Sequence, residues 1–327
     1  MNKQKIFITR NIGQEALDIL NPEYDLDIWK KDTPPPYEIL MQKAGNIDGI
    51  VTMLTDPIDR NFILKSVPKL KVISQMAVGF DNIDVKTATE NKIPVGNTPG
   101  VLTETTADFT WALLLSIARR VTEANAEVHH GIWKPWGPFV FTGREIYGSS
   151  LGIIGFGRIG QAVAKRAMGF NMKIYYSGPR RNEVAEKMTD AEYLPLNDLL
   201  AASDFITLHT YLSPSTYHLI NADTLKKVKT GAVIINTARG GIIDLDALLS
   251  ALQSGKVAAA ALDVTEPEPI PADHRLLSMP NVIITPHIAS SSQQTRKKMA
   301  TMVAENVMAG LKSEPLPYCV NPEIYRT

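Results

Sequence analysis

The chain is poor in cysteine, in net charge and in long apolar runs. Its 327 residues include one cysteine, Cys319, which excludes an internal disulfide framework and is typical of a reducing compartment. Lysine and arginine together number 34, as do aspartate and glutamate, so no excess charge favours nucleic acid or an anionic membrane as a partner. The most apolar helical stretch, residues 111–118, is far shorter than the roughly 20 residues that cross a bilayer. The first ten residues lack the apolar core and cleavage site of a signal peptide. We therefore expect a cytoplasmic protein.

The clearest pattern lies in residues 149–169, which read SSLGIIGFGRIGQAVAKRAMG. A short apolar run leads into three glycines at the spacing G-x-G-x-x-G, and a stretch of helical composition follows. The first glycine allows a tight turn, the second lets the backbone approach a pyrophosphate, and the third lets helix pack closely on strand. A lone glycine triplet is a weak signal, but here strand, turn and helix occur in the required order. The predicted nucleotide site comprises Gly155, Phe156, Gly157, Arg158, Ile159 and Gly160.

The residues after the next predicted strand, 173–176, bear on cofactor choice. Folds that prefer NAD usually place an aspartate or glutamate at its end, where the carboxylate binds the ribose hydroxyls. This chain has Ser177 there, and Arg180 and Arg181 follow at once. Guanidinium groups at this place can bind a 2′-phosphate, so we expect NADP(H) to be preferred and NAD(H) to be the weaker alternative. The competing interpretation is two solvated arginines in a loop.

Strand and helix signals alternate through the whole chain, which predicts an α/β protein with two doubly wound parallel-sheet domains. Residues 5–75 alternate without a glycine motif after their first strand, as in a flavodoxin-like domain. A predicted helix at 292–310 returns the chain to that half. We therefore expect a discontinuous substrate domain, residues 1–99 and 289–327, and a Rossmann domain that binds NADP, residues 100–288.

An aromatic segment interrupts this alternation. Residues 121–148 form a predicted loop region that contains several large apolar side chains outside any periodic element. The aromatic ones are Trp133, Trp136, Phe139 and Phe141. Such groups are costly to leave in water, so they pack against another subunit, cover a site, or are buried within the same chain.

One further strand end can receive a small anion. After the predicted strand 71–74 the chain reads QMAVGFDNID, and ligands of open α/β sheets bind at the carboxyl ends of strands. The backbone amides of Val78 and Gly79 are therefore candidates to bind an anion. From this stretch alone, a plain turn before a helix start is the simpler interpretation.

Polar side chains stand at the ends of three predicted strands, 232–235, 257–262 and 282–285. They are Arg239, then Asp263 with Glu268, then His287. Taken separately, an arginine after a strand is usually a surface ion pair, and a lone histidine is more often structural than catalytic. All of them nevertheless share the edge of the sheet where the glycine turn lies. Together they suit the transfer of a hydride to a carbonyl, which leaves an oxygen that needs a proton and nearby positive charge.

Each polar residue then has a predicted role. His287 provides the proton as imidazolium, and Glu268 bonds the other ring nitrogen and orients the ring. Arg239 grips a substrate carboxylate in a fork geometry and polarises the carbonyl. Asp263 is placed to hold the nicotinamide end of the cofactor.

The stretches GIIGFGRIG, NTARGG, LDVTEPEP and TPHIAS, in this order, resemble the D-isomer-specific 2-hydroxyacid dehydrogenase family. The similarity covers essentially the whole chain. The VTM stretch, AVGFDNID and the aromatic segment further resemble its glyoxylate and hydroxypyruvate reductase branch. The resemblance implies an enzyme that reduces a small 2-oxo acid to the D-2-hydroxy acid, an active site in the cleft between two domains, and a homodimer built from the cofactor domains.

The resemblance also implies site residues. By motif match, the catalytic residues are Arg239, Glu268 and His287. The implied substrate contacts are Met53, Leu54, Val78, Gly79, Arg239 and His287. Cofactor contacts beyond the glycine turn and Ser177, Arg180 and Arg181 are Thr106, His209, Thr216, Thr237, Ala238, Arg239, Asp263 and His287. No metal site is predicted.

Two departures and two alternatives accompany this assignment. Tyr211 stands in a loop where family members often have proline, which affects the cofactor contacts expected there. Reductases of this branch can also place an aromatic residue of the partner subunit at the pocket, and Trp136, Phe139 and Phe141 are the candidates. The alternative enzyme is a 2-ketogluconate reductase with a larger pocket. The alternative outside catalysis is a nucleotide-sensing protein that resembles a corepressor, although the intact catalytic residues count against it.

Overall fold

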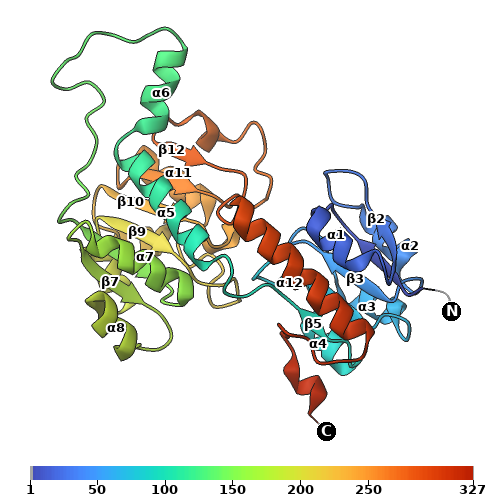
Figure 1. Ribbon diagram of the computed structural model, residues 1–327. Coiled ribbons are helices and arrows are strands. Elements are labelled where there is room, and N and C mark those ends of the chain that lie inside the picture. The colour runs from blue at the N-terminus through green and yellow to red at the C-terminus, as the bar shows by residue number, and fades with distance from the viewer. Residues whose placement is uncertain (1–2, 327) are drawn as a thin grey trace. The chain divides into compact units, whose positions relative to one another are not determined.

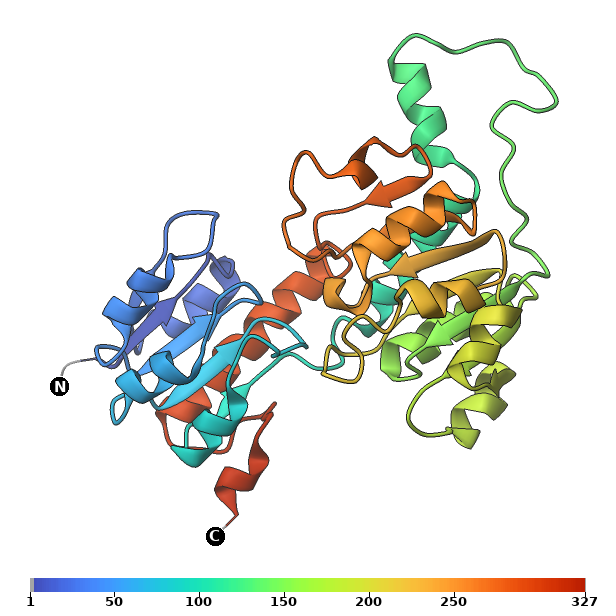
Figure 2. The ribbon, with the colours of Figure 1, turned by 180° about the vertical axis from the view of Figure 1, so that it is seen from behind.

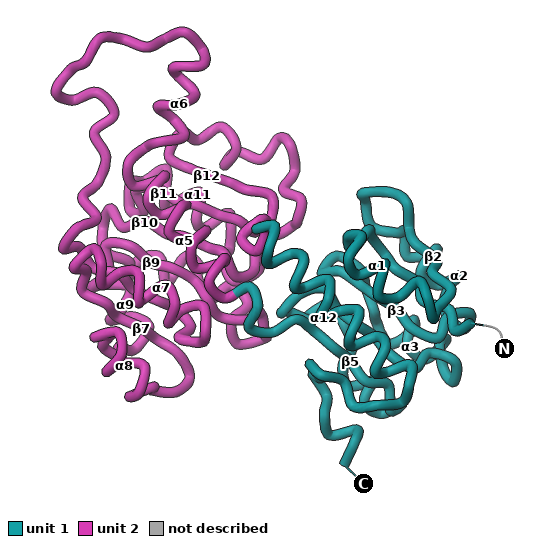
Figure 3. The backbone as a smooth tube through the Cα atoms, viewed as in Figure 1, with its two compact units in different colours: residues 1–102, 292–327 teal, residues 103–291 magenta. Residues whose placement is uncertain are grey.

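The computed structural model describes residues 3–326, and the chain divides into two compact units. Unit 1 consists of residues 1–102 and 292–327, and unit 2 of residues 103–291 (Figure 3). Each unit is a parallel sheet with helices on both faces. This confirms the predicted class of α/β fold with two doubly wound sheets.

The sheet of unit 1 has five strands in the order β2-β1-β3-β4-β5, and every pairing in it is parallel. The strands are β1 (Lys5–Ile8), β2 (Asp25–Ile28), β3 (Gly49–Thr52), β4 (Val72–Gln75) and β5 (Val95–Gly96). β1 lies between β2 and β3, so the direction in which strands are added reverses beside β1. In doubly wound sheets this reversal opens a crevice at the carboxyl ends of the strands, where ligands bind.

The helices of unit 1 cover the two faces of its sheet. One face carries α1 and α12, and the other carries α2, α3 and α4 (Figure 1). The helices are α1 (Gln14–Leu20), α2 (Tyr37–Lys43), α3 (Arg60–Ser66), α4 (Val85–Glu90), α12 (Gln293–Leu311) and the 3₁₀ turn η3 (Pro322–Tyr325). Because the sheet is covered on both faces, all four residues of β3 and of β4 are buried.

The sheet of unit 2 has seven parallel strands in the order β12-β11-β10-β9-β6-β7-β8. The strands are β6 (Ser150–Ile154), β7 (Lys173–Ser177), β8 (Ala191–Tyr193), β9 (Phe205–Leu208), β10 (Ala232–Asn236), β11 (Val257–Leu262) and β12 (Val282–Ile284). The order reverses beside β6, which is the strand that runs into the glycine motif. The topology therefore places the motif at the position where such sheets bind dinucleotides.

Two layers of helices enclose this second sheet. α5, α7 and α8 pack on one face, and α9, α10 and α11 pack on the other, and α5 lies beside α7 (Figure 1). The helices of unit 2, including α6 and two 3₁₀ turns outside these layers, are α5 (Thr103–Ala118), α6 (Val121–His129), α7 (Arg158–Met168), α8 (Glu183–Thr189), α9 (Leu196–Ala202), α10 (Ala222–Lys227), α11 (Leu245–Gln253), η1 (Gly240–Ile242) and η2 (Arg275–Ser278). Asp244 caps the start of α11, because its side chain accepts from the amides of Asp246 and Ala247. No helix within residues 3–326 is long and apolar enough to cross a membrane.

The aromatic segment, residues 121–148, extends from unit 2 as a long excursion between α5 and β6, and we call it the arm (Figures 1 and 2). The prediction of a loop throughout was wrong for its first part, because α6 occupies Val121–His129. Burial within the same chain is also wrong for three of its aromatic side chains. Trp133, Trp136 and Phe139 are 79%, 89% and 85% exposed. Phe141, in contrast, has an internal partner, the guanidinium of Arg120 at 5.1 Å from its ring centre.

Candidate active site

The glycine turn after β6 has the shape that a pyrophosphate requires. Gly155 adopts φ +94°, and a Cβ there would lie 2.6 Å from the carbonyl group of His209, so only glycine fits. A Cβ on Gly160 would collide with the carbonyl oxygen of Gly155, which explains the close contact of helix and strand. A Cβ on Gly157 would meet nothing within 4 Å. Open space therefore faces the start of α7.

The first turn of α7 supports anion binding at this place. Gly157 is its N-cap and supplies no side-chain hydrogen bond. The first amides of a helix have no partner within the helix, and they carry the positive end of its dipole. A phosphate is the group that these donors suit, so the residues of the turn fit a dinucleotide.

The loop after β7 holds the two arginines in different ways. Arg181 makes three hydrogen bonds of 2.9 to 3.1 Å with the carboxylate of Glu186, which also accepts from the hydroxyl of Tyr176. These bonds lower the pKa of Glu186 and raise that of Arg181. Arg180 is exposed, and its guanidinium has no hydrogen bond or ion pair among residues 3–326. Ser177 ends the strand and accepts the amide of Gly155 through its carbonyl at 2.8 Å.

Asp263, which follows β11, braces the segment that carries His287. Its carboxylate accepts from the hydroxyl of Thr285 at 2.6 Å and from the amides of Ile288 and Ala289 at 2.9 and 2.7 Å. Its carbonyl accepts the amide of His287 at 2.9 Å. The residue is 1% exposed, and these bonds use most of the acceptor positions of the carboxylate. Its side chain thus positions the segment that carries His287, in addition to the nicotinamide contact predicted for it.

His287 and Glu268 form a close pair. Nδ1 of His287 lies 2.6 Å from Oε1 of Glu268, and both side chains are partly exposed. His287 has a φ of +54°, a region that costs a non-glycine residue about 1–3 kcal/mol unless its surroundings fix it. The bonds from Asp263 on both sides of it supply that support. With Nδ1 bonded to a carboxylate, Nε2 is the ring nitrogen that can donate a proton to a reacting oxygen.

Arg239 stands at the turn between β10 and η1. Its guanidinium donates to the carbonyl of Ala238 at 2.8 Å, and its own carbonyl accepts from the side chain of Asn236 at the same distance. A Cβ on the next residue, Gly240, would collide with the carbonyl of Thr265. The absence of a side chain there lets the Arg239 turn pack directly on the segment that continues to Glu268.

A second histidine and carboxylate lie at this junction, and the sequence interpretation missed both. Glu266 lies 3.4 Å from Nε2 of His218, and the ring of Tyr217 stacks on that histidine at 4.0 Å. The amide of His218 donates to the carbonyl of Gly241 at 2.8 Å. The charge of Glu266 raises the pKa of Tyr217. The position of Glu266, two residues before Glu268, is a sequence signal that it lies near the site. Its pairing with His218 cannot be predicted in this way, because the two residues are far apart in the sequence.

The remaining predicted cofactor residues border the same edge. Thr237 and Thr110 of α5 share a hydrogen bond of 2.9 Å between hydroxyls, and Thr110 also donates to the carbonyl of Thr106. The hydroxyl of Thr216 donates to the carbonyl of Tyr211 and accepts the amide of Ser213, both at 2.8 Å, so it shapes its own loop. Ala238 is bonded through its amide to Asn236.

His209 follows β9 and packs against the glycine turn, since its carbonyl group lies close to Gly155. Its amide donates to the carbonyl of Ile154 at 2.7 Å. Its Nε2 atom is buried and has no partner among the described residues, although the residue as a whole is partly exposed. Burial lowers its pKa to about 3, so the ring is neutral at physiological pH.

In unit 1, the predicted substrate residues lie on two loops that follow neighbouring strands. Met53 and Leu54 follow β3, and Val78 and Gly79 follow β4. The carbonyl of Val78 accepts from the side chain of Asn97 at 2.8 Å, and that of Gly79 from Gln75 at 3.2 Å. Within residues 3–326, the amides of Val78 and Gly79 donate to no acceptor. These amides are therefore available to an anion.

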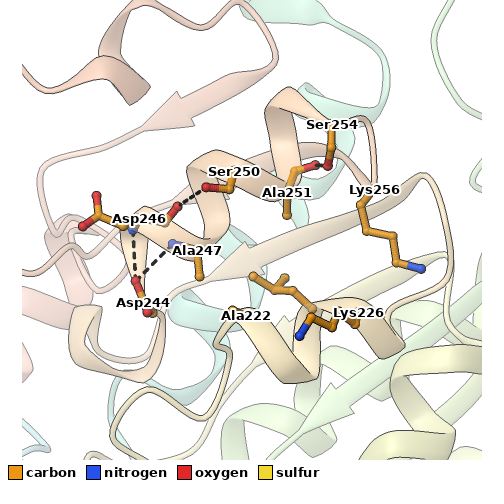
Figure 4. Close-up of a pocket in the computed structure, with 10 residues that line it drawn as sticks. Ala222, Lys226, Asp244, Asp246, Ala247, Ser250, Ala251, Ser254 and Lys256 are labelled. Atoms are coloured by element: carbon orange, nitrogen blue, oxygen red, sulfur yellow. Dashed lines mark hydrogen bonds between the residues drawn. The ribbon is translucent and has the colours of Figure 1, made fainter.

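A separate groove of about 770 Å³ lies between α10 and α11 (Figure 4). Several of its polar side chains make contacts within the chain: Asp244 caps α11, Ser250 bonds to the carbonyl of Asp246, and Lys226 pairs with Asp223. None of the described residues that line it is Arg239, Glu268 or His287. The groove therefore offers no arrangement for the chemistry described above.

Comparisons with known proteins place the chain in a family. The sequence model of "D-isomer specific 2-hydroxyacid dehydrogenase, NAD binding domain" matches residues 111–289. A glyoxylate reductase of Korarchaeum cryptofilum is 47% identical over 325 residues, which are 99% of this chain and 98% of that protein. The crystal structure of TT0316 protein from Thermus thermophilus is 40% identical, has a TM-score of 0.91, and matches over 97% of this chain and 100% of that one. An acyclic imino acid reductase in complex with NADPH and D-Arg is 26% identical, with a TM-score of 0.86 over 97% and 100% of the two chains.

These similarities agree with the geometry of the site. The matched NAD-binding model spans the glycine turn, the Arg239 turn and the Glu268 and His287 pair. The chain belongs to the D-isomer-specific 2-hydroxyacid dehydrogenase family, in its glyoxylate reductase branch, and is an NAD(P)-dependent oxidoreductase that reduces a 2-oxo acid to the hydroxy acid.

Proposed function

We propose that the protein reduces glyoxylate or hydroxypyruvate to glycolate or D-glycerate with NADPH, and that His287 donates the proton. The observation that carries this proposal is the 2.6 Å pairing of His287 with Glu268 at the sheet edge that also carries the glycine turn. The similarity to the glyoxylate reductase of Korarchaeum cryptofilum supports a small 2-oxo acid as the substrate.

The proton step uses the geometry of the pair. Glu268 bonds Nδ1, which orients the ring and stabilises the imidazolium, and Nε2 then donates its proton to the oxygen that becomes the hydroxyl. The imidazole is neutral after this step and takes a proton from water for the next turnover. When bound, a nicotinamide cofactor supplies the hydride that reduces the carbonyl carbon.

Two groups are proposed to bind the substrate carboxylate. Arg239 offers a planar guanidinium that can form paired hydrogen bonds with a carboxylate. The amides of Val78 and Gly79, which donate to no acceptor among residues 3–326, offer further donors. Met53 and Leu54 are the proposed contacts for the rest of the substrate. In this proposal residues 1–99 and 289–327 form the substrate domain and residues 100–288 the cofactor domain, which also contributes Arg239 and His287 to the substrate site.

The proposed cofactor site consists of the glycine turn and the loop after β7. The turn holds the pyrophosphate with the amides of Phe156 to Gly160, and the remaining predicted residues at the sheet edge complete the site. NADPH is preferred because Ser177 replaces the acid that would repel a 2′-phosphate and because Arg180 has no partner among the described residues. The structurally similar imino acid reductase was solved with NADPH.

The arm is proposed to hold two copies of the chain together. Its three most exposed aromatic side chains, Trp133, Trp136 and Phe139, project from a segment between α6 and β6. Aromatic side chains at such positions are typical of interfaces. A homodimer through unit 2 would cover them, and its formation is measured by analytical ultracentrifugation of wild type and of Trp133→Ser/Trp136→Ser.

The deciding experiment is the oxidation of NADPH measured against glyoxylate, hydroxypyruvate, 2-ketogluconate and pyruvate. We expect the highest kcat/KM with glyoxylate or hydroxypyruvate. A preference for 2-ketogluconate would support the alternative reductase. Binding of NADPH without turnover of any of the four acids would support a sensor and contradict the proposal.

A further inference from the structure

The side-chain amide of Asn82 makes three hydrogen bonds, and it joins two loops of unit 1. We call residues 53–56 the β3 loop and residues 76–82 the β4 loop. Nδ2 of Asn82 donates to the carbonyls of Met53 and Asp56 at 2.9 and 2.8 Å. Its Oδ1 accepts from Nε2 of Gln75 at 2.7 Å. One side chain on the β4 loop thus fixes both ends of the β3 loop.

The β3 loop is anchored on its other side by a buried carboxylate. Asp56 is 0% exposed, and its Oδ2 accepts from the hydroxyl of Thr9, from the hydroxyl of Thr52 at 3.1 Å and from the amide of Met53 at 2.7 Å. Arg10 lies 3.5 Å from its other oxygen. A buried, bonded charge of this kind holds its loop firmly because its release would leave the charge unpaired.

At Val78 and Gly79 the β4 loop is held by carbonyls rather than by amides. Gln75 donates to Gly79, and Asn97 donates to Val78. Nε2 of Gln75 therefore donates both to the carbonyl of Gly79 and to Oδ1 of Asn82. This arrangement turns the carbonyls toward the protein and leaves the amides of Val78 and Gly79 for a ligand.

We infer that Asn82 is a positioning residue for the substrate, because it sets the separation between the β3 and β4 loops. This inference rests on the proposed function, in which Met53 and Leu54 on one loop and Val78 and Gly79 on the other contact a short 2-oxo acid. A displacement of about 1 Å in such a contact set is enough to lower kcat/KM strongly. Asn82 itself does not need to touch the substrate.

The test compares Asn82→Ala with Asn321→Ala. Asn321 is a buried residue of the same unit with a similar set of hydrogen bonds. Its Nδ2 donates to Thr89 and to the carbonyl of Ile93, and its Oδ1 accepts the amide of Val95 and the thiol of Cys319 at 3.6 Å. Thr89 lies in α4, and Ile93 and Val95 lie at the amino end of β5, whereas Asn82 acts at the carboxyl ends of β3 and β4. Each variant loses both amide donors and the amide acceptor of its side chain, so both are expected to lower the melting temperature.

Only Asn82→Ala is expected to change the substrate constants. We expect KM for glyoxylate to rise by about tenfold or more, with kcat changed less than about threefold and KM for NADPH within about twofold of wild type. Hydrogen–deuterium exchange of the protein without ligands should speed up at residues 53–56 and 76–82 in this variant and not in Asn321→Ala. Gln75→Met removes the donor to Asn82 and to the carbonyl of Gly79 and keeps the volume. It should act in the same direction and serves if Asn82→Ala does not fold.

The results separate the two claims. If wild type reduces glyoxylate but Asn82→Ala and Gln75→Met give the KM and the exchange rates of Asn321→Ala, then Asn82 is only structural and the inference is overturned. If wild type reduces none of the four 2-oxo acids, the proposed function fails, and the substrate role of Asn82 fails with it.

Discussion

Arg181 and Glu186 are joined by three hydrogen bonds, and the adjacent Arg180 shares in none of them. The two arginines of the loop after β7 are therefore not equivalent. Arg181 must share its charge between Glu186 and any phosphate, whereas Arg180 can orient toward a phosphate without breaking a bond to another described residue.

Cofactor preference should follow this difference. We expect wild type to prefer NADPH over NADH by roughly 10-fold to 1000-fold in kcat/KM, because charge-assisted hydrogen bonds contribute about 1.5–3 kcal/mol when buried and less at an exposed site. Arg180→Ala should lose more of this margin than Arg181→Ala, and the double variant should lose most of it. NADH kinetics serve as the control, since NADH has no 2′-phosphate. Equal use of both cofactors by wild type would show that these arginines are merely solvated.

His287 should be needed for turnover and not for cofactor binding. His287→Gln is expected to lower reductive kcat by roughly 100-fold or more, because the alkoxide loses its proton donor. Stopped-flow rates measure turnover, and titration with NADPH measures cofactor binding. His274→Gln is the matched control, since His274 caps η2 in the same unit. Near-normal turnover of His287→Gln would remove His287 from this role.

Arg239 should act through its shape as well as its charge. Arg239→Lys keeps the positive charge and loses the planar fork, so paired bonds to a carboxylate cannot form. We expect kcat/KM for the 2-oxo acid to fall by more than about tenfold, mostly through KM. Arg275→Lys, an exposed position on η2, is the control. An unchanged constant would identify Arg239 as a structural ion pair.

His209 should make the fold sensitive to acid. Its pKa is about 3 in the folded protein, against 6.5 for a free imidazole, because its ring is buried. Below the higher value the unfolded chain binds a proton that the folded protein does not, so the free energy of unfolding falls as pH decreases from about 6.5 toward 3. The loss is at most about 1.4 kcal/mol per pH unit.

Denaturant unfolding of His209→Gln between pH 6.5 and 4.5 isolates this contribution. The variant lacks the titrating ring, so its stability relative to wild type should improve as the pH falls. A constant difference across this range would mean that the His209 ring takes up a proton in the folded state.

Much of the fold can be predicted from the sequence because its signals are local. Glycine spacing predicts the turn at Gly155 to Gly160, since conformation and close approach depend on the missing side chain. Continuous apolar runs such as 232–235 predict strands covered on both faces, and polar residues after them predict a shared reactive edge. The helix α6 was missed because its composition has no strong apolar period, and it buries no residue.

What only the tertiary structure decided is how each polar group is used. The positions of Asp263 and Arg181 in the sequence do not show that one braces residues 285–289 or that the other is bonded to Glu186. Nor does the sequence show that Asn82 joins two loops, or that Trp136 lies in solvent. The physical reason is that a hydrogen bond depends on groups brought together by the sheet, some of them distant in the chain, while a turn or a strand depends mainly on its own residues.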